Sequence, residues 1–333
     1  MGFKYNGLVL KKIDWFLTGI IAFALLGTFL PAPLPAMGAV DWLAKIMIAI
    51  LFFLYGVRLK PEETIAGLKH WRLHATILSY TYVIFPILGI LVGFLSPGLI
   101  GTETYRGLLW ICLLPSTVQS SINFTSIARG NVAGAIVSAS ASNLLGVFIT
   151  PVLALLLMNT TGLSLQASSI LDIAAQILLP FILGQLSRRW TADFVRRHPK
   201  LKYFDQASIL VVVYRAFSES HHEGIWGRTS IRDLLIICVF SVVVLALMLA
   251  ATWFGAWLLG FNRADQIAIQ FCGTKKSLAT GVPMSSVLFA GGVGLIVLPL
   301  MVFHQLQLIA CGALSSHYAA KSDEWHQAGG RRG

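Results

Sequence analysis

Long apolar segments recur along the whole chain, and this feature constrains the fold more than any other. A helix that crosses the hydrocarbon core of a bilayer needs about 20 mostly apolar residues. By this measure we expect ten spans, of which the seventh is short: 13–31, 41–57, 74–95, 107–128, 132–158, 168–187, 205–218, 233–260, 264–289 and 292–314. Charged residues make up 12% of the 333, whereas a soluble domain carries about 25%. The sequence therefore predicts an all-α membrane protein with ten transmembrane helices.

The net charge of +11 does not indicate nucleic-acid binding, because the chain has no polar domain on which a basic face could form. The partners we expect are the lipid bilayer and a small solute, with no nucleic acid. The first apolar segment follows Lys11 and Lys12, as in a signal peptide. Because many more spans follow it, we expect this segment to be retained as the first helix.

The placement of Lys and Arg predicts the orientation, since cytoplasmic loops of membrane proteins are enriched in both residues. With the N-terminus in the cytoplasm, 18 of these residues fall in inside segments, and 4 fall outside when Arg215, near the outer end of the seventh span, is counted. We therefore expect both termini to be cytoplasmic, in a protein of the bacterial inner membrane. The segment 188–202 should be cytoplasmic and the segment 218–232 extracytoplasmic.

Ten spans divide into two sets of five, and an odd number places the two sets in opposite orientations. The sequence thus predicts two inverted five-helix repeats, an architecture common among secondary transporters. The repeats would cover residues 1–160 and 161–316, followed by a cytoplasmic tail at 317–333. The fourth and ninth spans, which correspond to each other, are the most polar and the most interrupted.

The fourth span contains Pro115, which removes a backbone hydrogen bond, and a dense run of polar residues after it. The candidate binding residues in this run are Gln119, Ser120, Ser121, Asn123 and Thr125. Such a segment is either an unwound stretch that lines a hydrated cavity or a helix joined to its neighbours through serine and threonine.

The fifth span carries Ser138 and Ser142, which share one helical face. That face either supplies oxygens to an ion or substrate or forms a packing seam of small residues.

The ninth span contains Gln270, Thr274, Lys275 and Lys276. We expect Gly273 to loosen this helix, and Gly281 and Pro283 to break it again. Ionisable groups inside a membrane are candidates for function, although a tilted helix would let both lysines reach an interface. Because adjacent helical residues diverge by about 100°, we expect one of the two lysines to face the cavity.

The fourth, fifth and tenth spans contain no carboxylate, and the ninth has only Asp265, its second residue. A strong sodium or proton site usually includes a carboxylate. His304 in the tenth span is better explained as a packing residue. The four cysteines lack metal-ligand spacing and are expected to be small buried residues. We expect no cofactor beyond a coupling ion, either sodium or a proton.

Three sequence strings carry a family resemblance: ARGN at 128–131, ITP at 149–151 and FCGTKKSLATGVPM in the ninth span. The chain resembles the bile acid:sodium symporter superfamily, in its SBF-like branch, which includes a vertebrate orphan carrier. This resemblance implies a panel domain of spans one, two, six and seven, and a core domain of the other six. Spans four and nine would be broken helices that cross in the core.

The resemblance also implies a sodium site, since that family binds two sodium ions behind the crossing. A weak site of this kind would use Ser121, Asn123, Gln270 and Thr274, with hydroxyls from the fifth span. The glutamate of the family is replaced here by Gln270, and two lysines follow. Both changes weaken the sodium site and the case for bile acid as the substrate.

The sequence therefore predicts a secondary active transporter that moves a small anionic organic solute by alternating access, with weak or no sodium coupling. The alternative is a regulatory or sensor membrane protein without transport, linked to calcium homeostasis as the vertebrate relative is. An enzyme is disfavoured, because no paired aspartates, HExxH motif or nucleophile–base pair is present at suitable spacing.

Overall fold

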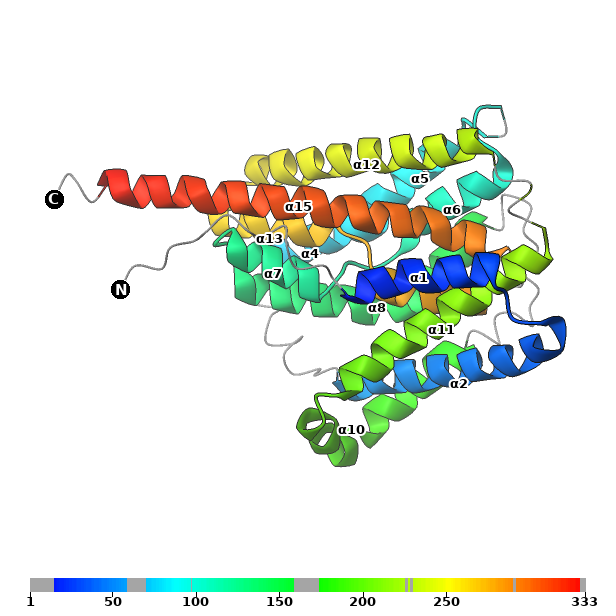
Figure 1. Cartoon of the computed structure of the whole chain (residues 1–333). Helices are drawn as coiled ribbons and strands as arrows, with labels where there is room; N and C mark the ends of the chain where they lie inside the picture. The colour runs from blue at the N-terminus through cyan, green and yellow to red at the C-terminus, as the bar shows by residue number, and fades with distance from the viewer. Residues whose placement is uncertain are drawn as a thin grey trace.

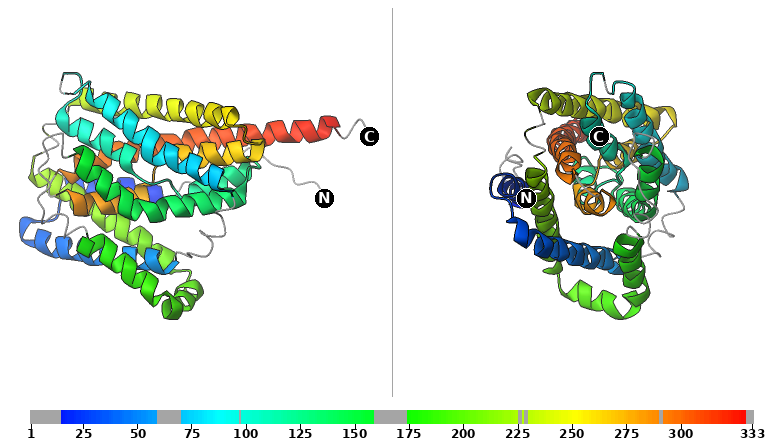
Figure 2. Two further views of the ribbon diagram at one scale, coloured as in Figure 1. Left: turned by 180° about the vertical axis from the view of Figure 1, so that it is seen from behind. Right: turned by 90° about the vertical axis from the view of Figure 1, so that its right-hand side faces the viewer.

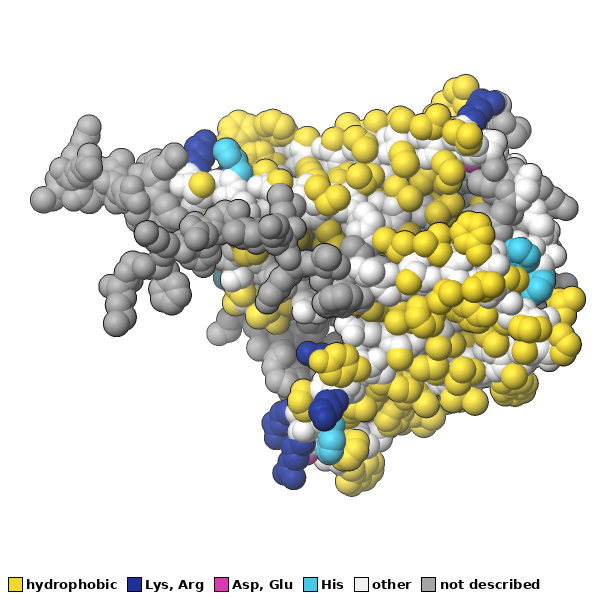
Figure 3. Space-filling model, viewed as in Figure 1, with side chains coloured by type: hydrophobic (Ala, Val, Ile, Leu, Met, Phe, Trp, Pro, Cys, Tyr) yellow, Lys and Arg dark blue, Asp and Glu magenta, His cyan; other side chains and the backbone are white. Residues whose placement is uncertain are grey.

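The computed structural model describes residues 15–58, 70–96, 98–158, 174–224, 227, 230–289 and 292–329. All regular elements in these ranges are helical (Figure 1). Within the described part of the chain, five helices are long and apolar enough to cross a membrane. Hydrophobic side chains cover the flank of the molecule, and lysine and arginine gather near the helix ends (Figure 3). This distribution is that of an integral membrane protein.

Four helices pack into a layer that we call the panel. Helix α1 contacts α11, and α2 contacts both α10 and α11. In the end-on view of Figure 2 these helices lie to one side of the remaining ones. Their bounds are Trp15–Phe29 (α1), Leu34–Arg58 (α2), Leu179–Arg197 (α10) and Leu201–His222 (α11), with the π-helical turn η5 at Ala174–Leu178 before α10.

Two glycines allow α2 and α10 to approach closely in the panel. A Cβ added at Gly56 would lie 2.1 Å from the carbonyl oxygen of Phe181, and one at Gly184 would lie 2.1 Å from that of Phe53. Small residues at helix crossings bring backbones together in membranes, where packing replaces the hydrophobic effect as the driving force. The side-chain amide of Gln185 donates to the Gly56 carbonyl at 2.8 Å and adds a polar contact to this crossing.

The other helices form a second layer, the core. Helix α15 packs on α6 and α12, and α13 contacts α4, α7, α8 and α12. The core comprises α4 (Trp71–Ser79), η3 (Tyr80–Ile84), α5 (Phe85–Gly93), α6 (Thr102–Leu113), α7 (Gln119–Ile127), α8 (Val132–Met158), α12 (Ile231–Leu258), α13 (Arg263–Thr274), α14 (Leu278–Leu288) and α15 (Val293–Gly329).

Several boundaries differ from those expected. The seventh segment forms a full helix of 22 residues, α11, because the polar ends around Tyr203 and Ser220 continue the helical hydrogen bonding. Helix α15 continues beyond the expected end at residue 314 and runs to Gly329, into the expected tail. The start of the sixth segment, 168–173, and the residues Lys11 and Lys12 lie outside the described part of the chain.

Two further expectations were wrong. Gly281 and Pro283 lie inside α14 and do not break it. Gly281 instead permits close packing, since a Cβ there would lie 2.4 Å from the Cδ1 atom of Leu114. Cys238 is exposed on α12, whereas Cys112, Cys272 and Cys311 are buried, and all four are free thiols.

Candidate functional site

The fourth span breaks in the core. Helix α6 ends at Leu113 and α7 begins at Gln119. Leu114 is extended, with φ −78° and ψ 155°, which is the backbone region that a residue before proline prefers. Pro115 lacks the N–H that would continue the helix. The predicted interruption at Pro115 is therefore confirmed.

The ninth span breaks at a corresponding place. Helix α13 ends at Thr274 and α14 begins at Leu278. Lys275 is extended, with φ −92° and ψ 151°. Ser277 caps α14, because its hydroxyl accepts from the Thr280 N–H at 3.2 Å. The side chain of a capping serine satisfies one of the N–H groups that a helix start leaves open.

The two breaks are hydrogen-bonded to each other. The Ser277 N–H donates to the Pro115 carbonyl at 2.9 Å, and the Ser116 hydroxyl donates to the Cys272 carbonyl at 2.6 Å. Backbone groups that leave a helix inside a membrane need partners within the protein. Each break therefore supplies hydrogen-bond partners for polar groups of the other.

Asn143 of α8 joins the same two breaks through its side chain. Its amide nitrogen donates to the Ser116 carbonyl at 2.5 Å, and its amide oxygen accepts from the Thr280 hydroxyl at 2.9 Å. A single side chain therefore fixes the distance between the α6–α7 break and the start of α14.

A cavity of about 660 Å³ lies between this crossing and the panel. On the core side, α7, α8, α14 and α15 contribute to its wall; on the panel side, α1, α2, α10 and α11 do. Its polar lining comprises Tyr55, Arg58, Thr117, Gln119, Ser120, Asn123, Asn143, Asp205, Gln206, Ser277, Thr280 and His304. Its volume is in the range of pockets that hold small organic molecules.

Two helix N-termini open onto this cavity. Val118 and Gln119 at the start of α7 line it, as do Leu278 and Ala279 at the start of α14. The first N–H groups of a helix have no intrahelical acceptor, and the helix dipole makes this end positive. Residues at both helix starts thus border one volume, an arrangement that suits an anion.

The charged residues of the lining come from the panel. Arg58 at the end of α2 forms an ion pair with Asp205 of α11. Because the pair is neutral as a whole, the helix ends carry the local preference for negative charge.

The residues predicted from the fourth and fifth spans separate into two groups. Gln119, Ser120 and Asn123 line the cavity. The others are buried in the core. Ser121 donates to the Phe271 carbonyl at 3.2 Å, Ser138 lies 2.6 Å from the imidazole Nδ1 of His74, and Ser142 accepts from the Ser116 N–H at 3.0 Å. Thr125 is fully buried on α7.

Gln270 and Thr274 face α12 in the structure. Gln270 donates to the Leu249 carbonyl and accepts from the Tyr318 hydroxyl, both at 2.9 Å. The Thr274 hydroxyl lies 3.1 Å from that of Thr252. Gln270 and Thr274 are thus hydrogen-bonded to neighbouring helices of the core, whereas Asn123 lines the cavity. The side chains expected to form one weak sodium site therefore lie in different surroundings.

Neither lysine lines the cavity, contrary to the expectation that one would. Both are fully buried. The backbone is extended at Lys275, so successive side chains point to opposite sides. The Lys275 ammonium nitrogen lies 4.1 Å from the ring centroid of Phe124, and that of Lys276 lies 4.0 Å from that of Phe85. Adjacent side chains diverge by about 100° only in a helix, and the backbone at Lys275 is extended, so the expectation of one lysine in the cavity was wrong.

Several cavity residues were not predicted from the sequence. Arg58, Tyr55 and Thr280 lie near span ends or among unremarkable residues, and nothing in the sequence placed them together. His304 was interpreted as a packing residue, yet it lines the cavity while its Nδ1 atom lies 2.7 Å from the Gln307 amide nitrogen. Asn143 offered a signal, since an amide inside an apolar span needs partners.

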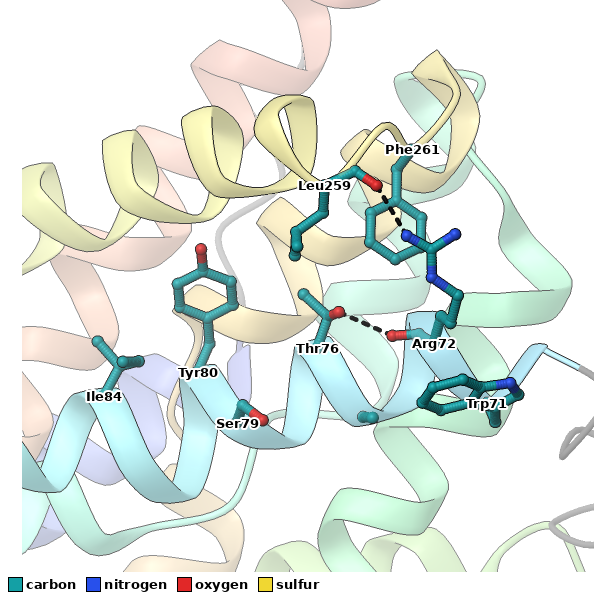
Figure 4. A pocket seen from close by; sticks show the side chains of 9 residues that line it. Trp71, Arg72, Thr76, Ser79, Tyr80, Ile84, Leu259 and Phe261 are labelled. Carbon is teal, nitrogen blue, oxygen red and sulfur yellow. Dashed lines mark hydrogen bonds between the residues drawn. The ribbon is translucent and has the colours of Figure 1, made fainter.

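A second hollow of about 420 Å³ lies away from the crossing, between α4 and the turn from α12 to α13 (Figure 4). Its lining is mostly apolar and includes Trp71, Tyr80 and Phe261. Arg72 lies at its end, donates to the Leu259 carbonyl at 2.9 Å and packs on Phe261 (Figure 4). No predicted site residue lies in this hollow.

Comparison with known proteins assigns the chain to a family. The model of the family described as "SBF-like CPA transporter family (DUF4137)" matches residues 14–320 of the chain. The chain belongs to this family. The resemblance drawn from the ninth-span string is thereby confirmed, and the chain is a transporter-family membrane protein.

Three relatives cover nearly the whole of the transporter-family chain. "Uncharacterized protein PA2026" of Pseudomonas aeruginosa is 49% identical over 315 residues, which are 93% of this chain and 94% of the relative. "Putative symporter YfeH" of Escherichia coli is 46% identical over 316 residues, covering 94% and 95%. "Sodium/bile acid cotransporter 7" of Mus musculus is 30% identical over 307 residues, covering 89% of each.

Proposed function

We propose that this protein is a secondary active transporter that binds a small anionic organic solute in the cavity at the helix crossing. The observation that carries the proposal is the convergence of two helix N-termini, those of α7 and α14, on one cavity. Anions bind at helix N-termini through free N–H groups and the positive end of the dipole. Broken helices in secondary transporters use the same arrangement.

Alternating access follows from the position of the cavity between panel and core. The order of elements supports two inverted five-helix repeats, since a broken helix is followed by a long one in each half: α6–α7 by α8, and α13–α14 by α15. Movement of the panel against the core would expose the cavity to one side of the membrane and then to the other. We place both termini in the cytoplasm and the protein in the inner membrane, in accord with the distribution of lysine and arginine.

Transport in this proposal does not require sodium. Gln270 is a neutral amide already bonded to α12 and α15, and two buried lysines lie within six residues of it. At about 5 Å and an effective dielectric constant near 20, two positive charges repel by roughly 3 kcal/mol. A proton is the coupling ion we propose, carried by Lys275, whose ammonium nitrogen contacts a phenylalanine ring and no hydrogen-bond acceptor in the described residues.

The test removes one N–H group from the site and leaves the helix intact. Leu278 is the first residue of α14, a position that proline tolerates because its N–H has no intrahelical acceptor. Ser277 before it is already extended, as a residue before proline should be. The matched control is Leu278→Ala, which also loses the leucine side chain but keeps the N–H.

The probes are carboxylates and sulfonates of graded size, with the corresponding neutral amides as controls. We expect some of these anions to raise the melting temperature of the wild type and of Leu278→Ala. A hydrogen bond to a charged group contributes about 1.5–3 kcal/mol, so Leu278→Pro should bind the same anions about 10- to 100-fold more weakly. Equal affinity of the two variants, or stabilisation by the amides alone, would refute the anion site.

Solute counterflow in proteoliposomes distinguishes transport from the regulatory alternative. We expect labelled anion to exchange across the bilayer with saturation kinetics. Binding of the anion without exchange would favour a sensor protein.

A further inference from the structure

The ammonium group of Lys276 has a complete set of oxygen acceptors inside the core. It donates to the carbonyl oxygens of Thr81 at 2.9 Å, Cys112 at 3.1 Å and Leu114 at 2.8 Å. These carbonyls belong to η3, to the end of α6 and to the residue after α6. The lysine is fully buried, and the transport proposal gives it no part in binding the solute or carrying the proton.

The number of acceptors indicates which charge state of the amine the surroundings suit. A protonated lysine has three N–H donors and a neutral one has two. Three carbonyl oxygens around the nitrogen therefore match the charged form. The ring of Phe85, with its centroid 4.0 Å away, adds a fourth favourable contact.

The surroundings of Lys276 resemble those of a bound monovalent cation. Backbone carbonyl rings replace the hydration shell of such ions in membrane proteins. The carbonyls at the end of a helix also attract positive charge, because they lack intrahelical donors and carry the negative end of the dipole. Cys112 and Leu114 are in this position at the end of α6.

We propose that Lys276 is a tethered cation that fills a monovalent-cation site built from three backbone carbonyls, two at the break after α6 and one in η3. The covalent cation holds η3, the end of α6 and the start of α14 together at any ion concentration. Removal of the side chain beyond Cβ should convert this place into a site for a free cation. This inference rests on the contacts of Lys276 and holds whether or not the protein transports an anion.

The experiment measures the melting temperature of purified Lys276→Ala while single cations are added. Sodium, potassium, ammonium, methylammonium and ethylammonium chloride are compared at constant ionic strength, with tetramethylammonium, which has no N–H, as the reference. A ligand at 100 times its Kd would raise the melting temperature by about 5 °C. We expect this rise with at least one of the small cations, and no such rise in the wild type.

The adjacent lysine provides a matched control. Lys275 is equally buried, but its nitrogen has a phenylalanine ring and no hydrogen-bond acceptor among the described residues. Its removal therefore leaves no oxygen ligands, and Lys275→Ala should gain nothing from the cations. Rescue of Lys275→Ala to the same extent would overturn the proposal, as would a flat response of Lys276→Ala.

Lys276→Met keeps the test decisive if the alanine variant does not fold. Methionine fills the space without supplying a donor, so three buried carbonyls lose their partner. We expect this variant to melt well below the wild type and to be insensitive to every cation. A methionine variant as stable as the wild type would show that no cation is needed there, and would overturn the proposal by itself.

Discussion

Substitution of Gly56 by alanine should loosen the crossing of α2 and α10. The new Cβ would lie 2.1 Å from the Phe181 carbonyl oxygen and 3.1 Å from the backbone nitrogen of Gln185. A backbone carbonyl cannot rotate away as a side chain can, so the helices would have to separate by about 1 Å to reach ordinary van der Waals contact. The shift would also strain the hydrogen bond from Gln185 to the Gly56 carbonyl.

The expected magnitude combines three effects. Overpacking of this kind costs about 1–3 kcal/mol, and the weakened hydrogen bond adds about 1 kcal/mol. Alanine in place of glycine returns up to about 1 kcal/mol of helix propensity. The net loss is about 2 kcal/mol, or a fall of about 5 °C in melting temperature.

Gly38 supplies a control within the same helix. It lies in α2 with no atom within 4 Å of an added Cβ. Gly38→Ala should therefore raise the melting temperature slightly, through helix propensity alone. Scanning fluorimetry in detergent measures the melting temperatures of the two variants. If Gly56→Ala is as stable as Gly38→Ala, the close crossing of the panel helices is wrong.

Three other substitutions test the site. Asn143→Ala removes two hydrogen bonds at the crossing, including that from Thr280, and should cost about 2–4 kcal/mol, measured by thermal unfolding; a loss below 1 kcal/mol would contradict the bridging role. Arg58→Gln leaves Asp205 unpaired beside the cavity and should weaken anion binding about tenfold, measured by titration; unchanged affinity would exclude a charge effect. Lys275→Met replaces a buried amine by an apolar chain and should raise the melting temperature. Solute exchange by this variant should no longer depend on a proton gradient, and an unchanged dependence would show that Lys275 does not couple transport to protons.

The sequence predicted the structural features that one residue and its near neighbours in the chain determine. Pro115 cannot continue a helix, and the polar run after it cannot face lipid, so a break in the fourth span followed directly. Alternation of apolar and polar composition likewise gave the approximate helix segments, with errors at ends such as that of α15.

The content of the site could not be predicted in the same way, because it depends on how distant segments meet. Arg58 lines the cavity only because α2 packs beside α10 and α11. The lysines were placed wrongly for a local reason: the ninth span breaks at Lys275, where the backbone is extended. The glycine and proline expected to break it, Gly281 and Pro283, fit inside α14.

Counterflow of an organic anion into proteoliposomes, in sodium and in potassium buffers, is the most direct test of transport without sodium. The wild type is compared with Leu278→Pro and Leu278→Ala, using the carboxylate or sulfonate that raises the melting temperature most. We expect equal saturable exchange in both buffers, retained by the alanine variant and reduced at least tenfold at low solute by the proline variant. Exchange that occurs only in sodium, or that proline at residue 278 leaves unchanged, would contradict the account.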